Sequence, residues 1–133
     1  MKNIEICGVI SEPGQSKMAY IPVAVMPRGD TLQIPVKIFC GAHPGPVLGL
    51  VCTSHGDETF PILVFEEAFK RIDLIKLKGT IACIPVLNPV AFESGTRLTG
   101  LDMTTEAVNM NLVFPGNQSA SLISRMAYEI TEH

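Results

Sequence analysis

The segment that decides the fold is Val51-Cys52-Thr53-Ser54-His55-Gly56-Asp57-Glu58-Thr59. An apolar run at 47–52 leads into it, and a run with helical periodicity, Phe60 to Ile72, follows at once. The pattern predicts a strand end, a tight loop and a helix start, which is where α/β proteins bind ligands. His55 and Glu58 are side chains of types that bind zinc. Taken alone, the segment fits equally well a plain helix N-terminus stabilised by its two acidic residues.

The residues around this segment predict a βαβ unit. Residues 47–53 form a continuous apolar run, as in a buried parallel strand, and Thr80 to Leu87 form a second such run. Between them, charged side chains supply one face of a helix and apolar side chains recur at helical spacing on the other. The apolar set is Phe60, Leu63, Val64, Ala68 and Ile72. A right-handed crossover between two parallel strands is therefore expected.

The N-terminal residues predict an antiparallel, β-rich segment. Links rich in proline and glycine separate strands expected at 3–10, 18–26 and 31–40. Gly41 to Pro46 is expected to be a rigid loop. The chain is thus divided into a β-rich segment, residues 1–40, and an α/β part, residues 41–133.

The C-terminal part is less regular. Residues 88–118 show no pattern that predicts a helix or strand, and so long a loop inside a compact domain is typically functional. Ser119 to Thr131 predict a closing helix, with Asn117 or Ser119 as its N-cap.

Composition excludes several classes of function. The chain has 133 residues, 47% of them hydrophobic, a net charge of −3 and no basic cluster, which argues against a nucleic-acid or anionic-membrane surface. The N-terminus lacks a signal-peptide core and no apolar run could span a membrane, so a cytoplasmic protein is expected. The cysteines, which form no Cys-x-x-Cys pair, are expected to be free thiols.

Four boxes in order carry a resemblance to a known family. They are His55-Gly56-Asp57-Glu58, Asn88-Pro89-Val90-Ala91-Phe92, Gly95-Thr96-Arg97 and Asn109-Met110-Asn111-Leu112-Val113-Phe114-Pro115-Gly116. Together they resemble the succinylglutamate desuccinylase/aspartoacylase family, a branch of the zinc carboxypeptidase superfamily. The resemblance implies an α/β fold in which the antiparallel β segment precedes a zinc-carboxypeptidase-like mixed-sheet αβα sandwich. Only the N-terminal part of that sandwich is expected here, so the fold is expected to be truncated.

The resemblance also implies roles for particular residues. His55 and Glu58 match two zinc ligands of the family. Arg97 matches the arginine that polarises the scissile carbonyl and stabilises the oxyanion, and it also contacts the substrate. Asn111 matches the asparagine of an Asn-Arg pair that holds the substrate carboxylate. One Zn²⁺ per site and a small N-acyl substrate are the implied cofactor and partner.

The chain departs from the family pattern in three ways. Leu112 stands where the family has the arginine of the Asn-Arg pair, which removes a bidentate clamp on a carboxylate. Asn109 replaces an aspartate of the same box. The family's third ligand, a histidine on a later strand, and its catalytic glutamate would fall beyond residue 133. His43 and His133 are expected to be an ordinary loop histidine and a terminal one.

Two hypotheses remain. The first is a zinc-dependent hydrolase, a deacylase acting on the amide bond of an N-acyl amino acid or related compound, of which this chain is an incomplete part. The second is a non-catalytic, truncated relic or a metal-binding or interaction module of the same fold. In either case, a truncated sheet would expose a hydrophobic edge, so self-association through that edge is expected.

Overall fold

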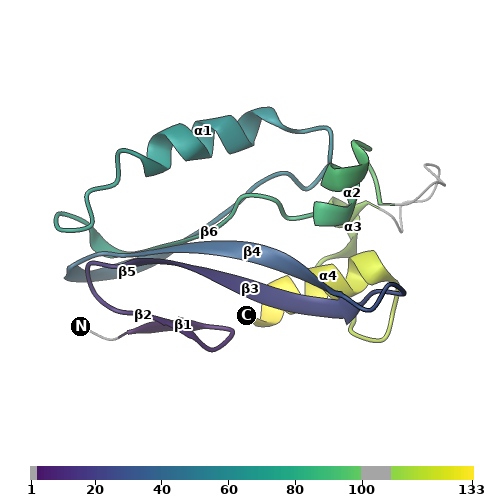
Figure 1. The fold of residues 1–133 in the computed structure, drawn as a ribbon, viewed down its shortest axis with the longest axis horizontal. Coiled ribbons are helices and arrows are strands. Elements are labelled where there is room, and N and C mark those ends of the chain that lie inside the picture. Colours follow the sequence, from purple (N-terminus) through teal and green to yellow (C-terminus); the bar gives the residue numbers. More distant parts are fainter. Residues whose placement is uncertain (1–2, 100–108) are drawn as a thin grey trace.

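The computed structural model describes residues 3–99 and 109–133. Along the chain the elements are β1 (Ile4–Ile6), β2 (Val9–Ser11), β3 (Ser16–Val25), β4 (Thr31–Cys40), β5 (His43–Val51), α1 (Phe60–Phe69), β6 (Lys78–Ile84), α2 (Pro89–Ser94), α3 (Met110–Val113) and α4 (Leu122–Glu132). Figure 1 shows how they are arranged. The α/β class expected from the sequence is confirmed.

The centre of the fold is a four-stranded sheet in the order β3-β4-β6-β5. β4 runs antiparallel to both β3 and β6, whereas β5 runs parallel to β6, with Leu50 opposite Cys83. Because α1 connects β5 to β6, the predicted βαβ unit is confirmed. Lys37 to Cys40 of β4 pair with β6, so one sheet extends across residue 40. The division of the chain at that residue stays a prediction.

The N-terminal residues form a hairpin, so the prediction of a single strand at 3–10 is wrong. β1 and β2 pair antiparallel, with Ile6 opposite Val9. The residues between them, Cys7 and Gly8, have φ angles of 47° and 77°. Positive φ at both positions is typical of the tight turn that fits the twist of paired strands. The continuous apolar pattern hides this turn because Cys7 is not a residue that usually marks one.

Apolar side chains cover both faces of the sheet. On one face, α4 and the β1–β2 hairpin pack on the strands, and this core contains Ile21, Ile34 and Met126, all buried. On the other face, Phe69 of α1 contacts Phe39, with ring centroids 4.8 Å apart. Figure 1 shows α1 on one side of the sheet and α4 with the hairpin on the other. The sheet is therefore the middle layer of three.

β5 is not the buried strand that the sequence predicts. It begins at His43, within the expected loop, and it is the edge strand of the sheet. Val47, Leu48 and Val51 are each more than half exposed. Apolar residues at successive positions are typical of a strand whose two faces are both covered. In the described residues, β5 is instead exposed along most of its length, and no further strand pairs with its free edge.

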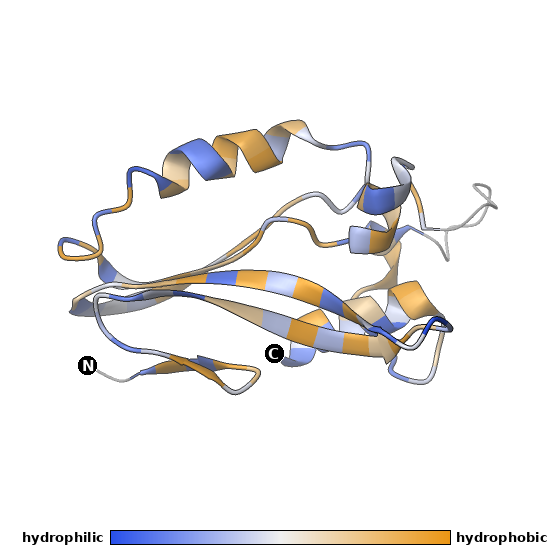
Figure 2. Ribbon diagram, viewed as in Figure 1, coloured by the Kyte–Doolittle hydropathy of each residue, from blue (hydrophilic) through white to orange (hydrophobic). Residues whose placement is uncertain are grey.

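Helix α1 is confirmed, but the face predicted to be buried is wrong. Phe60, Leu63 and Val64 are exposed, whereas Phe65 and Phe69 stack on each other and face the sheet. Figure 2 shows hydrophobic residues at several positions along the helix. Spacing alone could not choose the buried face, because more than one face of the helix is apolar.

The region from 88 to 118 contains short helices where no regular element was expected. α2 begins after Asn88 and α3 after Asn109, and each asparagine side chain accepts a hydrogen bond from a backbone N–H of its helix. Residues 100–108 lie outside the described part of the chain. The closing helix α4 is confirmed, although its N-cap is Ser121 and not Asn117 or Ser119.

Two further expectations can be compared with the structure. The four cysteines, Cys7, Cys40, Cys52 and Cys83, are free thiols, as predicted. In the described ranges, 3–99 and 109–133, none of the helices has the length and apolar character needed to cross a bilayer.

Candidate active site

The loop after β5 has a conformation fixed by its own backbone contacts. Cys52 N–H donates to Ile84 O at 3.1 Å, and Leu87 N–H donates to Cys52 O at 3.0 Å, which anchors the loop to the end of β6. Thr53 is buried and has a φ of 55°, a left-handed conformation that costs a β-branched residue about 1–3 kcal/mol. Its hydroxyl donates to Glu58 O at 3.1 Å, so the strained residue closes the loop around His55.

Helix α2 supports the loop from the other side. A Cβ placed on Gly56 would lie 2.0 Å from Ala91 O, closer than any real side chain approaches a backbone atom. Only glycine allows the first turn of α2 to come this near. The loop and α2 are therefore in direct backbone contact, and the position of one fixes the position of the other.

His55 and Glu58 lie side by side at the carboxyl end of β5. His55 Nδ1 is 2.7 Å from Glu58 Oε1, and His55 is only 4% exposed. The hydrogen bond with His55 holds the pKa of Glu58 below its usual value, against the smaller opposing effect of burial. The carboxylate is therefore ionised at neutral pH, as a metal ligand must be.

Asn109 determines which nitrogen of His55 carries a hydrogen. His55 Nε2 is 3.1 Å from Asn109 Oδ1, and this same oxygen accepts a hydrogen bond from Asn111 N–H at 3.1 Å, which identifies it as the oxygen of the amide. An amide oxygen only accepts, so Nε2 must donate. Nδ1 then faces the Glu58 carboxylate oxygen, so a nitrogen and an oxygen of metal-binding types lie side by side.

Arg97 reaches the same place from the segment after α2. Gly95 ends that helix with a φ of 62°, and Thr96 N–H donates back to Ala91 O at 3.0 Å. The Nη1 atom of Arg97 lies 3.8 Å from Glu58 Oε1 and 3.7 Å from Asp57 Oδ1. The side chain is about half exposed, so these ion pairs are weak and the guanidinium is accessible to a ligand.

The other residues singled out in the sequence lie farther from this pair. Asn111 is exposed on α3, and its backbone N–H, bonded to Asn109, links it to the site. Leu112 follows it and is also exposed. His43 starts β5, at the end opposite the loop, and His133 Nε2 lies 3.6 Å from Glu129 Oε2 on α4. The structure thus brings together His55, Glu58 and Arg97 and leaves Asn111 at the rim.

The donor types fit zinc, although the described residues supply only two of them. Imidazole nitrogen and carboxylate oxygen are borderline ligands that suit Zn²⁺. Within residues 3–99 and 109–133, no group of three or more His, Cys, Asp and Glu side chains is arranged to hold a metal ion. His55 and Glu58 are thus the candidate ligands that this part of the chain offers.

Three residues of the site have contacts that the sequence-based interpretation did not predict. They are Gly56, Asn88 and Asn109, which connect segments up to 54 positions apart in the chain; of these, only Asn109 was singled out, as a departure from the family pattern. The boxes contained all three residues, but spacing cannot show which side chains meet in space.

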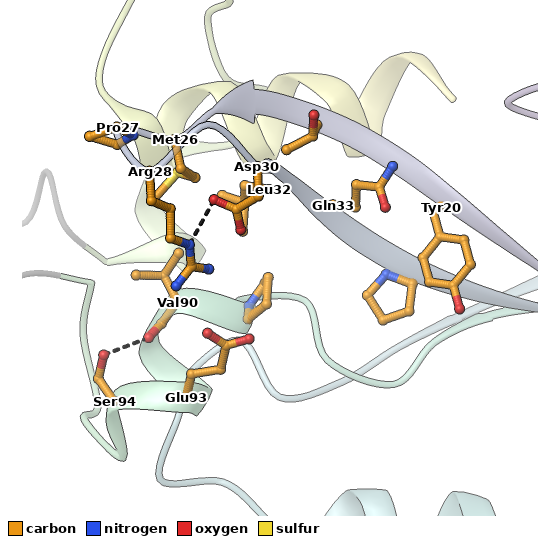
Figure 3. Close-up of a pocket in the computed structure, with 13 residues that line it drawn as sticks. Tyr20, Met26, Pro27, Arg28, Asp30, Leu32, Gln33, Val90, Glu93 and Ser94 are labelled. Carbon is orange, nitrogen blue, oxygen red and sulfur yellow. Dashed lines mark hydrogen bonds and ion pairs between the residues drawn. The ribbon is translucent and has the colours of Figure 1, made fainter.

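A cavity of about 530 Å³ lies elsewhere, between the β3–β4 turn and α2 (Figure 3). Its wall carries Arg28 and Asp30, whose side chains form a 2.7 Å ion pair, together with Glu93. The hydrogen bond from Arg28 lowers the pKa of Asp30. Its lining includes neither His55 nor Arg97, so the convergence of polar groups, and not the cavity, locates the candidate site.

Comparisons with known proteins assign the family. Residues 44–133 match the succinylglutamate desuccinylase/aspartoacylase catalytic domain. The N-alpha-acetyl-L-2,4-diaminobutyric acid deacetylase of Halomonas elongata is 27% identical over 107 residues, which are 80% of this chain and 26% of that protein. The chain belongs to the succinylglutamate desuccinylase/aspartoacylase family, as its sequence boxes indicate.

Solved structures agree with this assignment. An aspartoacylase family protein from Mesorhizobium loti superposes with a TM-score of 0.74 at 28% identity, covering 91% of this chain and 37% of that one. A succinylglutamate desuccinylase/aspartoacylase from Rhodobacter sphaeroides has a TM-score of 0.71 at 22% identity, covering 85% and 34%, and shares the fold. The chain thus spans between about a quarter and three-eighths of the length of these relatives.

Proposed function

We propose that this chain carries the ligand loop and the carbonyl-binding arginine of a zinc-dependent deacylase. The reaction would be hydrolysis of the amide bond of an N-acyl amino acid or a related compound. The observation that carries the proposal is the pair His55 Nδ1 and Glu58 Oε1, 2.7 Å apart, with Asn109 holding the opposite nitrogen of the imidazole. This geometry supports a metal site at the point where the two atoms meet.

Each residue has a distinct part in this proposal. His55 and Glu58 would hold Zn²⁺, which when bound supplies a positive charge that polarises water and a carbonyl oxygen. Arg97 offers N–H donors to the oxygen of the scissile amide, where negative charge develops during attack. Its half-exposed guanidinium lies within 4 Å of Glu58, so a carbonyl bound there would lie next to the ligand pair.

The substrate class follows from the family and from α3. The relative from Halomonas elongata is named as a deacetylase of an N-acetylated diamino acid, which supports a small N-acyl amino acid or a similar amide. Leu112 is exposed next to Asn111 and cannot grip a carboxylate. We therefore propose that the preferred amide lacks a free α-carboxylate at this position, with Asn111 contributing hydrogen bonds alone.

Metal titration is the first test of this function. The folded chain is titrated with Co²⁺ and Zn²⁺, and the His55→Ala variant is compared with His43→Ala, whose side chain is exposed at the far end of β5. We expect binding that disappears in His55→Ala and persists in His43→Ala. If neither metal binds the unaltered chain at millimolar concentration, the zinc proposal is refuted and the non-catalytic interpretation is favoured.

Hydrolysis of N-acyl substrates is the second test. N-acetylated amino acids with free and with amidated α-carboxylates are offered to the metal-loaded chain. We expect no appreciable turnover, because the described residues contain no group of three side chains that could hold a metal ion. Zinc-dependent hydrolysis that His55→Ala abolishes would overturn this expectation and show that the chain is catalytic alone. The cytoplasmic location stays a prediction.

A further inference from the structure

Asn88 is a polar side chain with no exposed surface. It stands between the end of β6 and the start of α2, in the Asn-Pro box. Burying an amide without partners costs several kcal/mol in an apolar environment, so such a residue is retained where its hydrogen bonds are all made. Its contacts therefore show what the residue does.

The amide of Asn88 bonds to three different segments. Its Oδ1 accepts from Ala91 N–H at 3.1 Å and from Thr99 Oγ1 at 3.0 Å. Its Nδ2 lies 2.7 Å from Thr99 Oγ1 and donates a longer bond, 3.4 Å, to Ser54 O. The backbone N–H of the same residue donates to Thr53 O at 3.3 Å. One residue thus holds the ligand loop, the first turn of α2 and the segment after α2.

These three segments carry the groups of the candidate site. Ser54 directly precedes His55, and Thr99 lies two positions after Arg97. We infer that Asn88 is a positioning residue that fixes the His55 loop and the Arg97 segment relative to each other. The inference rests on the proposed function for its purpose, but the linkage itself is a property of the folded chain.

A helix N-cap alone does not account for these contacts. Serine or aspartate caps a helix about as well as asparagine, because capping needs only an acceptor. The donor Nδ2, which reaches Ser54 O and Thr99, has no use in a cap. Asparagine is the residue that presents an acceptor to α2 and a donor to the ligand loop from one short side chain.

Two variants separate the linkage from the cap. Asn88→Ser keeps an acceptor for α2 and loses the donor to Ser54. Thr99→Val keeps Asn88 and its cap but removes the hydroxyl that connects it to the Arg97 segment, whereas Thr99→Ser restores that hydroxyl. Asn117→Ala is a matched control, because Asn117 makes a local, exposed hydrogen bond to Ser119 N–H.

The first readout is amide hydrogen exchange of the metal-free chain. In Asn88→Ser we expect the amides of Glu58 and Thr96 to exchange about ten-fold faster. In Thr99→Val we expect the same acceleration at Thr96 alone. Thr99→Ser should exchange at rates close to those of the unaltered chain. Amides of the β3–β4 pair should keep their rates. Uniform acceleration throughout the sheet would mean general destabilisation, and unchanged rates at both sites would mean no linkage. Either result overturns the inference.

The second readout is Co²⁺ affinity and the visible spectrum of the bound ion. We expect Asn88→Ser to weaken binding about ten-fold or more, as for other residues that orient a ligand, and Asn117→Ala to leave it unchanged. If the unaltered chain binds no Co²⁺, the proposed function fails, while hydrogen exchange still decides the linkage. If it binds Co²⁺ and Asn88→Ser binds equally well with the same spectrum, the inference fails and the proposed function stands.

Discussion

Gly56→Ala should be the most damaging single-methyl change in the ligand loop. The added Cβ would lie 2.0 Å from Ala91 O and 2.1 Å from Ala91 C, both backbone atoms that cannot rotate away. An ordinary contact begins near 3.4 Å, so the loop and α2 would have to separate by about 1.4 Å, the difference between 3.4 Å and 2.0 Å. We expect a loss of about 3 kcal/mol in the free energy of unfolding, the upper end for overpacking.

Gly49→Ala provides a matched control for this prediction. Gly49 lies on β5 with nothing within 4 Å of an added Cβ, and it needs no left-handed backbone. We expect its unfolding free energy to change by less than about 0.5 kcal/mol, because alanine also restricts the unfolded chain. Urea unfolding followed by circular dichroism measures both variants, and thermal midpoints should differ by about 10 °C.

The two variants also predict different effects on the site. Separation of the loop from α2 would move His55 away from Asn109 and weaken Co²⁺ binding, whereas Gly49→Ala should leave the metal affinity unchanged. Equal stability and equal affinity in the two variants would refute the conclusion that the loop and α2 are held in backbone contact.

Other changes test the remaining features. Asn109→Ala removes the acceptor from His55 Nε2 and should weaken Co²⁺ binding about 10- to 100-fold in a titration, and an unchanged affinity would contradict its role. Burial raises the pKa of Cys83 to about 11 from 9.0, so iodoacetamide at pH 8 should label it, by mass spectrometry, only when urea is present. Because the pKa is higher in the folded state, the stability contributed by this buried thiol is complete below pH 9 and is lost as the pH rises towards 11. Leu48→Lys places a charge on the exposed edge strand and should reduce self-association in sedimentation velocity, and an unaltered chain that stays monomeric at high concentration would contradict the expected oligomer.

The sequence predicted those elements whose pattern is local. The β5–loop–α1–β6 unit follows from a change of hydrophobic period around His55, and the structure has strand, loop and helix in that order. The position of Glu58 beside His55 could also be foreseen, because the two residues lie three positions apart in one short loop. Four ordered boxes gave the family, which the comparisons support.

Features that depend on long-range packing could not be predicted. Whether α1 buries Phe69 or Phe60 depends on the strands that it meets, since both faces are apolar. The edge position of β5 depends on which strands pair, which no residue of β5 determines by itself. The turn at Cys7 required a positive φ in a residue that seldom adopts one.

The contact between His55 and Asn109 fixes the orientation of the imidazole ring. Asn109 is neutral, so it fixes the orientation of the imidazole without adding charge, whereas an aspartate at this position would place a second carboxylate near Glu58. The single negative charge next to His55 is therefore that of the Glu58 carboxylate, whose pKa the hydrogen bond with His55 lowers. Because Asn109 Oδ1 also caps α3, the orientation of His55 and the position of the segment that carries Asn111 depend on the same oxygen atom.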